Sequence, residues 1–379
     1  MRYCKKCVMP DTRPNILFDE EGVCSACKNY ENRKNIDWDK RWRQLEAVAD
    51  KYRGCNGNYY DCIITGSAGK DTYYQVHIFK EVLKMNPLLL SVNNFTWTKT
   101  GKRNWKNLLN EFGIDAVRLT QNPRACKRMF AKGLEKGVPT WYFDFAIYAW
   151  PLYMATKLKI PLVVYGENVN YEYGGINKED QPSALNQINN DAVRPIPTEE
   201  WIDNEIEEKD FACCRYPTEE EIKNSKLNPI YLSYYVPWSG YKNMEFARNR
   251  GFRTLSDTNE WERKGFLEQY DQIDTVGYLV HSWFKFVKYG HFRVTDVASI
   301  WIREGRMTRE EAVKKVISED WKLDKKMLKD FLMYIGYTEE EFWKIVEKHA
   351  NRNIIEKRNN NWRLKENIVE ALKKGGKAE

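Results

Sequence analysis

The segment Tyr59–Thr72 constrains the fold of this chain more than any other part of its sequence. Its apolar run Cys62–Thr65 ends at Gly66 and is typical of a buried strand. From Thr72 onward, apolar residues recur at helical spacing. A glycine-bearing, hydroxyl-rich turn between a strand and a helix brings backbone N–H groups and the positive helix end together. The segment therefore predicts an anion-binding turn on an α/β scaffold.

Apolar runs and helix-like segments continue to alternate after this turn. Further strands are expected at 88–92, 116–119 and 162–165, and helices at 105–112, 126–133 and 145–158. This alternation predicts a parallel sheet covered by helices on both faces. Ligands bind such sheets outside the carboxyl ends of the strands. Residues 66–72 and 166–175 both follow predicted strands, so we expect them to face one crevice.

Four of the nine cysteines form two CxxC pairs near the N-terminus, Cys4 with Cys7 and Cys24 with Cys27. Each pair presents two thiolates to one side, and two pairs can close a tetrahedron around zinc. The residues between the pairs are too few for a core of their own, so a metal would supply their folding energy. The doubled spacing predicts a structural zinc site, with redox-active or unligated thiols as the alternatives. We interpret the remaining cysteines as packing thiols: Cys55, Cys62, Cys126, Cys213 and Cys214.

The character of the sequence changes beyond about residue 180. Residues 180–230 are polar and interrupted by prolines, and helical signals dominate from 231 onward. Capping boxes are expected at Thr218, Thr308 and Thr338, and a turn at 359–361. The predicted organisation is a zinc knuckle over residues 1–35, an α/β domain over 36–180 and a mostly helical, substrate-binding region over 181–379.

Charge and hydropathy indicate which partners to expect. The net charge of +7 over 379 residues is mild for a nucleic-acid-binding protein and suits an anionic small molecule. The sequence has no apolar run near the ~18–20 residues of a spanning helix. The N-terminal residues also lack the apolar stretch of a secretory signal. We therefore expect a cytoplasmic protein with a small-molecule substrate and no membrane partner.

The turn at 67–72 does not have the spacing of a Walker A loop, and an ordinary glycine turn is the plainest alternative. It resembles the SGGxDS signature of the PP-loop ATP pyrophosphatases, which cleave ATP between the α- and β-phosphates and adenylate a substrate oxygen. The signature has glycine and serine where this chain has Ala68 and Thr72. Ala68 places a Cβ where the backbone is expected to need a positive φ. The resemblance implies that ATP, with Mg²⁺ on its phosphates, is held by Ser67, Ala68, Gly69, Lys70, Asp71, Thr72 and Gly166.

Three more segments extend this likeness over nearly the whole chain: the cysteine block from residue 3 to 27, the segment 165–175, and the segment 296–312. With the loop, they look like the N-acetyl sugar amidotransferases of the PP-loop superfamily. That resemblance implies ATP-dependent conversion of a sugar acetamido group to an acetamidino group. Ammonia would attack an adenylated intermediate, with release of AMP and pyrophosphate. The implied substrate is a nonulosonate such as pseudaminic acid, used in flagellin glycosylation, or a related acidic or nucleotide-linked acetamido sugar.

The resemblance also suggests roles for individual side chains. Lys70 would stabilise the phosphates, and Asp71 would be a ligand of Mg²⁺. Glu167 and Glu172 would orient ammonia or accept its proton, the alternative being solvated carboxylates on a surface loop. Candidates for sugar binding are Asn168, Tyr173, His281, His291 and Arg303, although His281 suits a packed core equally well.

Two other function classes compete with this interpretation. A tRNA-thiolating PP-loop enzyme would need a persulfide cysteine or an iron–sulfur cluster near the loop, and no second CxxC pair follows Thr72. A non-enzymatic zinc-ribbon nucleic-acid module would leave the loop and most of the chain unexplained. The sequence shows no glutaminase signature, so ammonia is expected from solution or from a separate glutaminase subunit.

Overall fold

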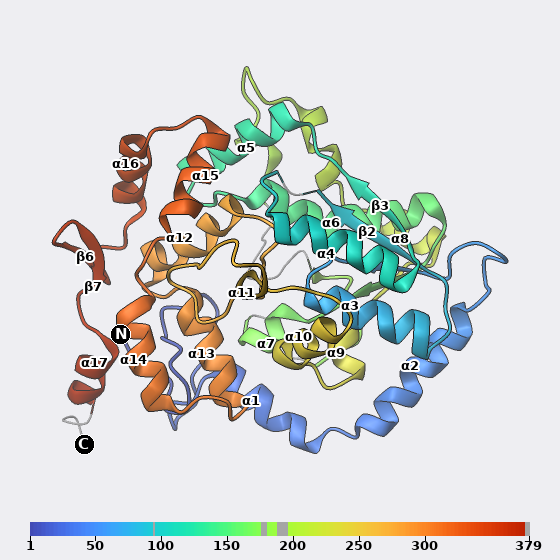
Figure 1. The fold of residues 1–379 in the computed structure, drawn as a ribbon, viewed down its shortest axis with the longest axis horizontal. Coiled ribbons are helices and arrows are strands. Elements are labelled where there is room, and N and C mark those ends of the chain that lie inside the picture. The colour runs from blue at the N-terminus through green and yellow to red at the C-terminus, as the bar shows by residue number, and fades with distance from the viewer. Residues whose placement is uncertain (94, 176–179, 188–195, 376–379) are drawn as a thin grey trace.

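The computed structural model describes residues 1–93, 95–175, 180–187 and 196–375. Its centre is a five-stranded sheet in the order β3-β2-β1-β4-β5, and every neighbouring pair is parallel (Figure 1). The strands are β1 (Cys62–Thr65), β2 (Pro87–Val92), β3 (Asp115–Leu119), β4 (Leu162–Tyr165) and β5 (Asn228–Tyr231). The predicted parallel sheet is therefore confirmed, and four of its strands lie where the apolar runs place them.

Strand β5 is the member of the sheet that the sequence does not reveal. It begins Asn228-Pro229, and proline in a short apolar run argues against a central strand. Here the proline is tolerated because β5 is the last strand of the sheet: β4 is its only partner strand, and its other side meets only an isolated antiparallel bridge between Ser183 and Ile230. The sheet thus takes its last strand from residues beyond the expected boundary at 180.

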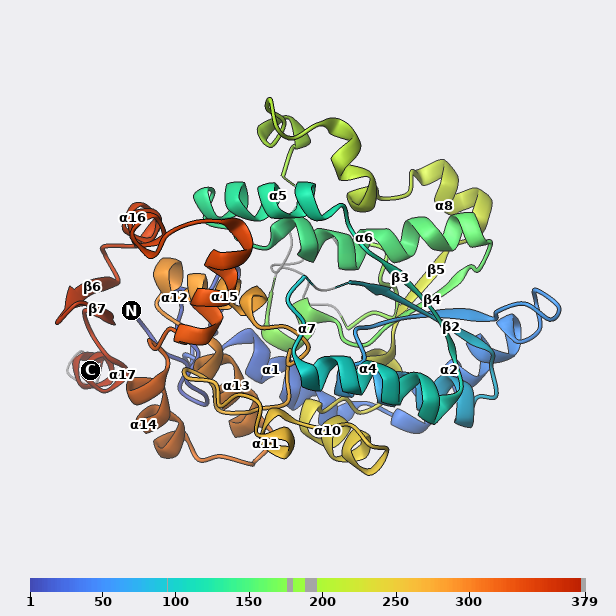
Figure 2. The same ribbon diagram turned by 45° about the horizontal axis from the view of Figure 1, so that its top comes forward.

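Helices cover both faces of the sheet, as the alternation predicts (Figure 2). On one side lie α5 (Pro123–Glu135), α6 (Trp141–Leu158) and α8 (Glu219–Ser225). On the other lie α2 (Trp38–Tyr52), α3 (Lys70–Val76, continued as a π-helix over His77–Val82), α4 (Lys99–Phe112) and α10 (Gly240–Asn249). The side chains of β1, β2 and β4 are almost all buried between these layers, whereas those of the edge strand β3 are partly exposed. This layered core fixes the loops at the carboxyl ends of the strands.

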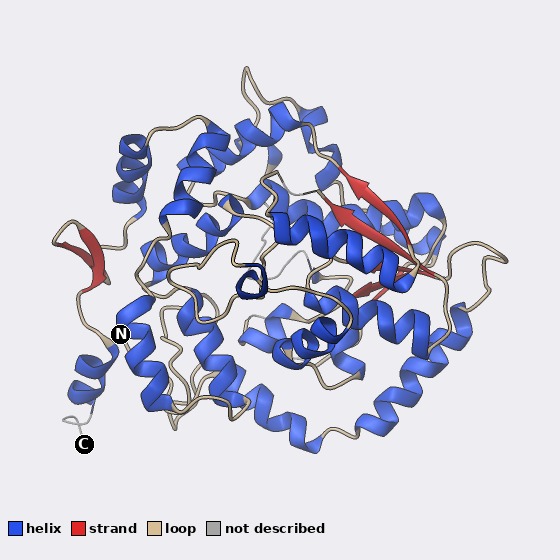
Figure 3. Ribbon diagram, viewed as in Figure 1, coloured by secondary structure: helices blue, strands red, loops and turns tan. Residues whose placement is uncertain are grey.

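The C-terminal region is mostly helical, as expected (Figure 3). Its helices are α12 (Val280–Tyr289), α13 (Arg293–Arg303), α14 (Arg309–Glu319), α15 (Lys325–Ile335), α16 (Glu339–His349) and α17 (Ile368–Gly375). The three predicted capping boxes begin α8, α14 and α16. The expected turn joins β6 (Ile355–Arg358) to β7 (Asn361–Leu364), an antiparallel hairpin. Asn359 and Asn360 both have positive φ, which asparagine tolerates in such turns.

The remaining elements are short. They are α1 (Ser25–Asn32), α7 (Val169–Tyr173), α9 (Leu232–Tyr235), α11 (Leu255–Thr258) and the 3₁₀ helices Arg33–Asn35, Thr198–Glu200, Glu208–Cys214 and Gly277–Leu279. The N-terminal segment that carries the four cysteines runs beside α13 and α14 of the C-terminal region (Figure 1). Among the described helices, none has the length and apolar character needed to span a membrane.

Candidate functional site

A cavity of about 390 Å³ lies at the carboxyl ends of β1 and β4, where the strand order reverses. The loops after these two strands line it from one side, as predicted from the sequence. Residues of the C-terminal region line it from the other, including members of segment 270–275 and one side of α13 from Arg293 to Arg303. The cavity thus lies between the sheet and the C-terminal helices.

The loop between β1 and α3 has the backbone of an anion-binding turn. Ala68 has a φ of 65°, so the alanine does occupy the left-handed conformation that the family signature assigns to glycine. Gly66 cannot be replaced without a rearrangement, because a Cβ there would lie 2.2 Å from Oγ1 of Thr72. Gly69 is the N-cap of α3, and the first turn of this helix, whose backbone N–H groups have no partners within the helix, lines the cavity. All the predicted loop residues line the cavity except Ala68, which is buried behind it.

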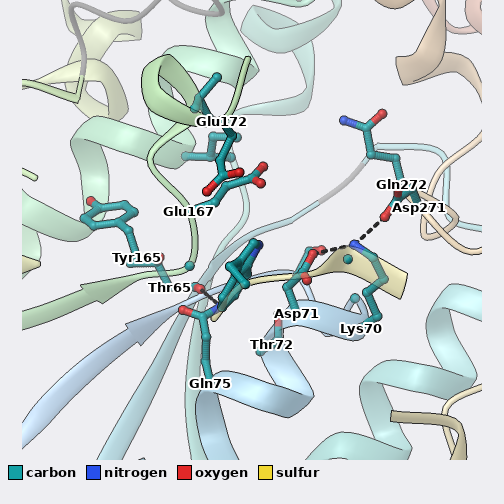
Figure 4. Close-up of a pocket in the computed structure, with 18 of the residues that line it drawn as sticks. Thr65, Lys70, Asp71, Thr72, Gln75, Tyr165, Glu167, Glu172, Asp271 and Gln272 are labelled. Atoms are coloured by element: carbon teal, nitrogen blue, oxygen red, sulfur yellow. Dashed lines mark hydrogen bonds and ion pairs between the residues drawn. The ribbon is translucent and has the colours of Figure 1, made fainter. Parts of the chain in front are cut away.

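Lys70, the first residue of α3, is buried with its ammonium group between two carboxylates (Figure 4). Its Nζ lies 2.5 Å from Oδ2 of Asp71 and also contacts Oδ1 of Asp271, which belongs to the C-terminal region. Asp71 accepts a further hydrogen bond from Nδ2 of Asn243 at 2.7 Å. Burial alone would lower the pKa of Lys70, but the charges of Asp271 and Asp71 outweigh it and raise the pKa well above its ordinary value. Lys70 is therefore a fixed cation in the cavity.

Glu167 and Glu172 enter the cavity from the loop after β4 and from α7 (Figure 4). Burial, together with the negative charges of Asp71 and Glu172, raises the pKa of Glu167 from 4.5 to about 8. Burial also raises the pKa of Glu172, but the charges of Arg33 and Arg303 oppose this shift. Glu172 forms an ion pair with Arg33. The carboxyl group of Glu167 is thus mostly neutral at pH 7, and that of Glu172 is held in an ion pair.

Gly166, the remaining predicted nucleotide-binding residue, lies between β4 and Glu167 and lines the cavity. A Cβ at this position would lie 3.0 Å from the ring of Trp238 and 3.4 Å from Nε2 of Gln75. Glycine therefore lets the loop after β4 pack closely against α3.

The five candidate sugar-binding residues do not come together. Tyr173 and Arg303 line the cavity, whereas Asn168, His281 and His291 are not among its described lining residues. Asn168 is the N-cap of α7, where its Oδ1 accepts a hydrogen bond from the backbone N–H of Tyr171 at 3.3 Å.

The two histidines lie elsewhere in the C-terminal region, His291 buried and His281 half-buried. The ring nitrogens of His281 contact the carbonyl of Tyr278 at 2.7 Å and the hydroxyl of Ser282 at 3.0 Å. Nδ1 of His291 lies 3.8 Å from Oδ1 of Asp296. Burial lowers the pKa of each histidine to about 3, so both are neutral at physiological pH. The interpretation of His281 as a core residue agrees with this placement.

Aromatic and basic side chains form the part of the cavity that faces α13. Trp301 and Arg303 on α13 line it together with Tyr241, Tyr173 and Tyr30. Nη2 of Arg303 donates to the carbonyl of Glu172 at 3.4 Å, and its Nη1 has no hydrogen-bond partner among the described residues. Flat aromatic faces beside an arginine suit an anionic, partly apolar ligand such as a sugar acid.

The four predicted metal ligands are adjacent and buried, and their geometry fits a tetrahedral ion. The sulfurs of Cys4 and Cys27 are 3.9 Å apart, and those of Cys7 and Cys24 are 3.7 Å apart. Zinc–sulfur bonds of ~2.3 Å in a tetrahedron place the sulfurs about 3.8 Å apart. Three backbone N–H groups donate to Sγ of Cys4 at 3.3–3.4 Å, as expected around a thiolate ligand. The cluster can therefore bind a metal, and zinc is our proposal for the ion.

The cysteine knuckle contacts the helix that carries Glu172. Oγ of Ser25, on α1, donates to the carbonyl of Gly174 at 2.9 Å. Gly174 ends α7 with a φ of 78°, and a Cβ there would lie 2.7 Å from the backbone nitrogen of Ala26. These close contacts let the metal-binding segment position one wall of the cavity.

Sequence reasoning missed three charged residues of this site: Asp271, Arg293 and Arg33. All three line the cavity, and Nη2 of Arg293 lies 2.6 Å from Oδ2 of Asp271. Each pairs with a residue far away in the sequence, so no local spacing marks it.

Comparison with protein families decides the identity of the C-terminal region. Residues 256–369 match the family model described as LPS biosynthesis protein WbpG-like, C-terminal domain. This region is similar to the C-terminal domain of WbpG-like proteins. The motifs of the sequence resemble the PseA and WbpG members of the sugar amidotransferases, and over residues 256–369 the match supports the resemblance to the WbpG type. The matched range contains Asp271, Arg293 and Arg303, so the WbpG-like domain provides one side of the cavity.

A curated relative and two solved structures are also similar. An uncharacterized protein of Methanocaldococcus jannaschii is 25% identical over 120 residues, which cover 31% of this chain and 43% of the relative. The chain therefore matches less than half of that relative's length. NMN synthetase from Francisella tularensis aligns with a TM-score of 0.28 and 11% identity, covering 57% of this chain and 94% of that one. U34-tRNA thiolase NcsA from Methanococcus maripaludis, with its 4Fe–4S cluster, aligns with a TM-score of 0.23 and 14% identity, covering 66% and 82%. Likenesses with TM-scores this low carry no argument about this chain.

Proposed function

We propose that this protein is an ATP-dependent sugar amidotransferase. The amide oxygen of an acetamido sugar attacks the α-phosphorus of ATP, and pyrophosphate leaves. Ammonia then adds to the activated carbon, AMP departs with the former amide oxygen, and loss of a proton gives the acetamidino group. The observation that carries this proposal is the cavity shared by the loop at Gly66–Thr72 and the WbpG-like domain, with Lys70 and Glu167 facing into it.

The phosphate end of ATP suits the loop and Lys70. The backbone N–H groups of the first turn of α3 and the Lys70 ammonium are positive groups at the same end of one helix, and this end lines the cavity. They would stabilise the negative charge that develops on the phosphates as pyrophosphate leaves. Asp71 is placed to hold Mg²⁺, which would neutralise phosphate charge when bound.

Glu167 suits the proton transfers of the second step. Once the amide oxygen has been adenylated, the adjacent carbon accepts ammonia as the neutral base, and the adduct must then lose protons. A carboxyl group whose pKa is about 8 exchanges protons readily near neutral pH. Glu172, fixed by its ion pair with Arg33, would orient the incoming ammonia. Ammonia itself would come from solution or from a separate glutaminase subunit.

The sugar would bind against the α13 side of the cavity. Tyr173, Tyr241 and Trp301 offer rings for the sugar face, and Arg303 offers a guanidinium for a carboxylate or a nucleotide phosphate. This arrangement supports an acidic or nucleotide-linked acetamido sugar, with pseudaminic acid as the example that the family resemblance implies.

The test is a direct assay of the reaction. The protein is incubated with ATP, Mg²⁺, ammonium and an acetamido nonulosonate. We expect AMP, pyrophosphate and a product about one mass unit lighter than the substrate, because NH replaces the amide oxygen. Lys70→Ala should abolish AMP formation, whereas Lys102→Ala, which removes an exposed lysine of α4, should not. AMP that forms only when tRNA is added would instead support a tRNA-modifying enzyme.

A further inference from the structure

The contact between Lys70 and Asp271 joins the nucleotide loop to the WbpG-like domain. Asp271 is firmly held from its own side of the cavity. Its backbone N–H donates to Oε2 of Glu268 at 2.8 Å, and its carbonyl accepts from Nη1 of Arg263 at 2.7 Å. Its second carboxylate oxygen lies 2.6 Å from Nη2 of Arg293. The WbpG-like domain thus anchors the backbone of Asp271 and directs its carboxylate at Lys70 in the loop at Gly66–Thr72.

Lys70 has little freedom to leave this position. Its side chain is buried, and the stem passes so close to Gly240 that a Cβ there would lie 3.2 Å from Cε. The ammonium group therefore stays where it is, and its anionic partners must be exchanged around it. Asp71 and Asp271 already supply two negative charges to this one cation. A phosphate group that approached Lys70 would meet both of them at close range.

We propose that Asp271 is a positioning residue that acts as a displaceable counter-ion, occupying on Lys70 the place that the pyrophosphate end of ATP takes. This inference rests on the proposed function only in that the loop at Gly66–Thr72 binds phosphate. When phosphate binds, Asp271 leaves Lys70 and keeps its ion pair with Arg293. Arg293 lines the same cavity and stays paired with Asp271. Binding of nucleotide at Lys70 therefore changes the position of a charged pair in the WbpG-like domain.

The proposal predicts that removing a polar side chain of the binding site strengthens ligand binding, where a loss of affinity is the usual result. Asp271→Asn removes the competing negative charge and should tighten the binding of inorganic pyrophosphate about tenfold, a change of ~1.4 kcal/mol. Titration calorimetry with the full-length protein, without added Mg²⁺, measures this affinity. Asp271→Ser should act in the same direction. Asp271→Glu retains the charge and should restore an affinity close to that of the unmodified protein.

Asp39→Asn is the matched control, because it makes the same charge change at an exposed position of α2. It should leave the affinity within about twofold, since a distant exposed charge is screened by solvent. A purely structural role for Asp271 would lower the melting temperature without tightening pyrophosphate binding.

Three outcomes would overturn the inference. In the first, the unmodified protein binds pyrophosphate but the folded Asn and Ser variants bind it equally or more weakly. This result contradicts the role of Asp271 as a displaceable counter-ion and leaves the proposed function untouched. Failure of both variants to fold would show that the ion pair is structural. Absence of pyrophosphate and ATP binding in every form would contradict both the counter-ion and the proposed function.

Discussion

Asn29 and Tyr171 are joined by two reciprocal hydrogen bonds. Nδ2 of Asn29 donates to the carbonyl of Tyr171 at 2.9 Å, and the hydroxyl of Tyr171 donates to the carbonyl of Asn29 at 3.1 Å. Asn29 lies on α1, which begins directly after Cys24, and Tyr171 precedes Glu172 on α7. The metal-binding knuckle is therefore part of the support of the cavity rather than a separate appendage.

Removal of the metal should unfold the knuckle and loosen α7. Cys27→Ser deletes one of four buried ligands, and structural zinc sites supply most of the folding free energy of segments this small. We expect loss of the bound metal, measured by elemental analysis, and a fall in the free energy of unfolding of more than about 3 kcal/mol. Limited proteolysis should then cut at α7. Cys55→Ser, at an exposed cysteine outside the cluster, is the control and should change neither quantity.

Gly174→Ala should disrupt the contact between the knuckle and α7. The residue has a φ of 78°, and an added Cβ would lie 2.6 Å from Oγ of Ser25. The left-handed backbone costs about 1–2 kcal/mol for alanine, and the steric overlap adds about 1–3 kcal/mol. We expect a loss of about 3 kcal/mol in urea unfolding.

Gly54→Ala separates the two contributions to that loss. Gly54 has a φ of 68°, but an added Cβ would meet nothing within 4 Å. Alanine at this position should therefore cost only the backbone term of about 1–2 kcal/mol. Equal losses at the two glycines would show that the packing of Gly174 against α1 contributes nothing.

Ala68→Gly tests whether the nucleotide loop is strained. Ala68 has a φ of 65°, where glycine is more stable than alanine, so the substitution should stabilise the protein by up to about 1 kcal/mol. The control is Ala47→Gly at an exposed position within α2, where glycine should destabilise by about 1 kcal/mol. Thermal unfolding of the two variants should shift in opposite directions. A shift in the same direction would contradict strain at Ala68.

The sequence was most informative where local pattern determines structure. The loop Ser67–Thr72, the four cysteines and the three threonine capping boxes are local motifs, and the structure has each of them as expected. The positive φ of Ala68 could also be expected from the sequence, because the family signature has glycine at this position.

Features that depend on distant partners could not be predicted in this way. Lys70 meets Asp271, and Glu172 meets Arg33, only after the sheet and the C-terminal helices have packed. Strand β5 likewise becomes recognisable only beside β4, because its apolar run is short and contains Pro229. Asn168 was a plausible ligand by type, but its side chain is used to cap α7.

The raised pKa of Glu167 should make stability depend on pH in a defined direction. In the folded protein this pKa is about 8, against 4.5 ordinarily, so the folded state retains a proton between these values that the unfolded state has lost. The free energy of unfolding should therefore fall as pH rises from about 4.5 to about 8, because the folded state must then bury a charge. Glu167→Gln abolishes this effect and should become more stable than the unmodified protein by up to about 4–5 kcal/mol at pH 9, with little difference at pH 4.5. Urea unfolding at pH 4.5, 7 and 9 measures the difference.

Glu46→Gln, at an exposed glutamate of α2, should show no such trend. A pH-independent difference for Glu167→Gln would mean that this carboxyl group ionises normally in the cavity, and would remove it as the group that exchanges protons with ammonia.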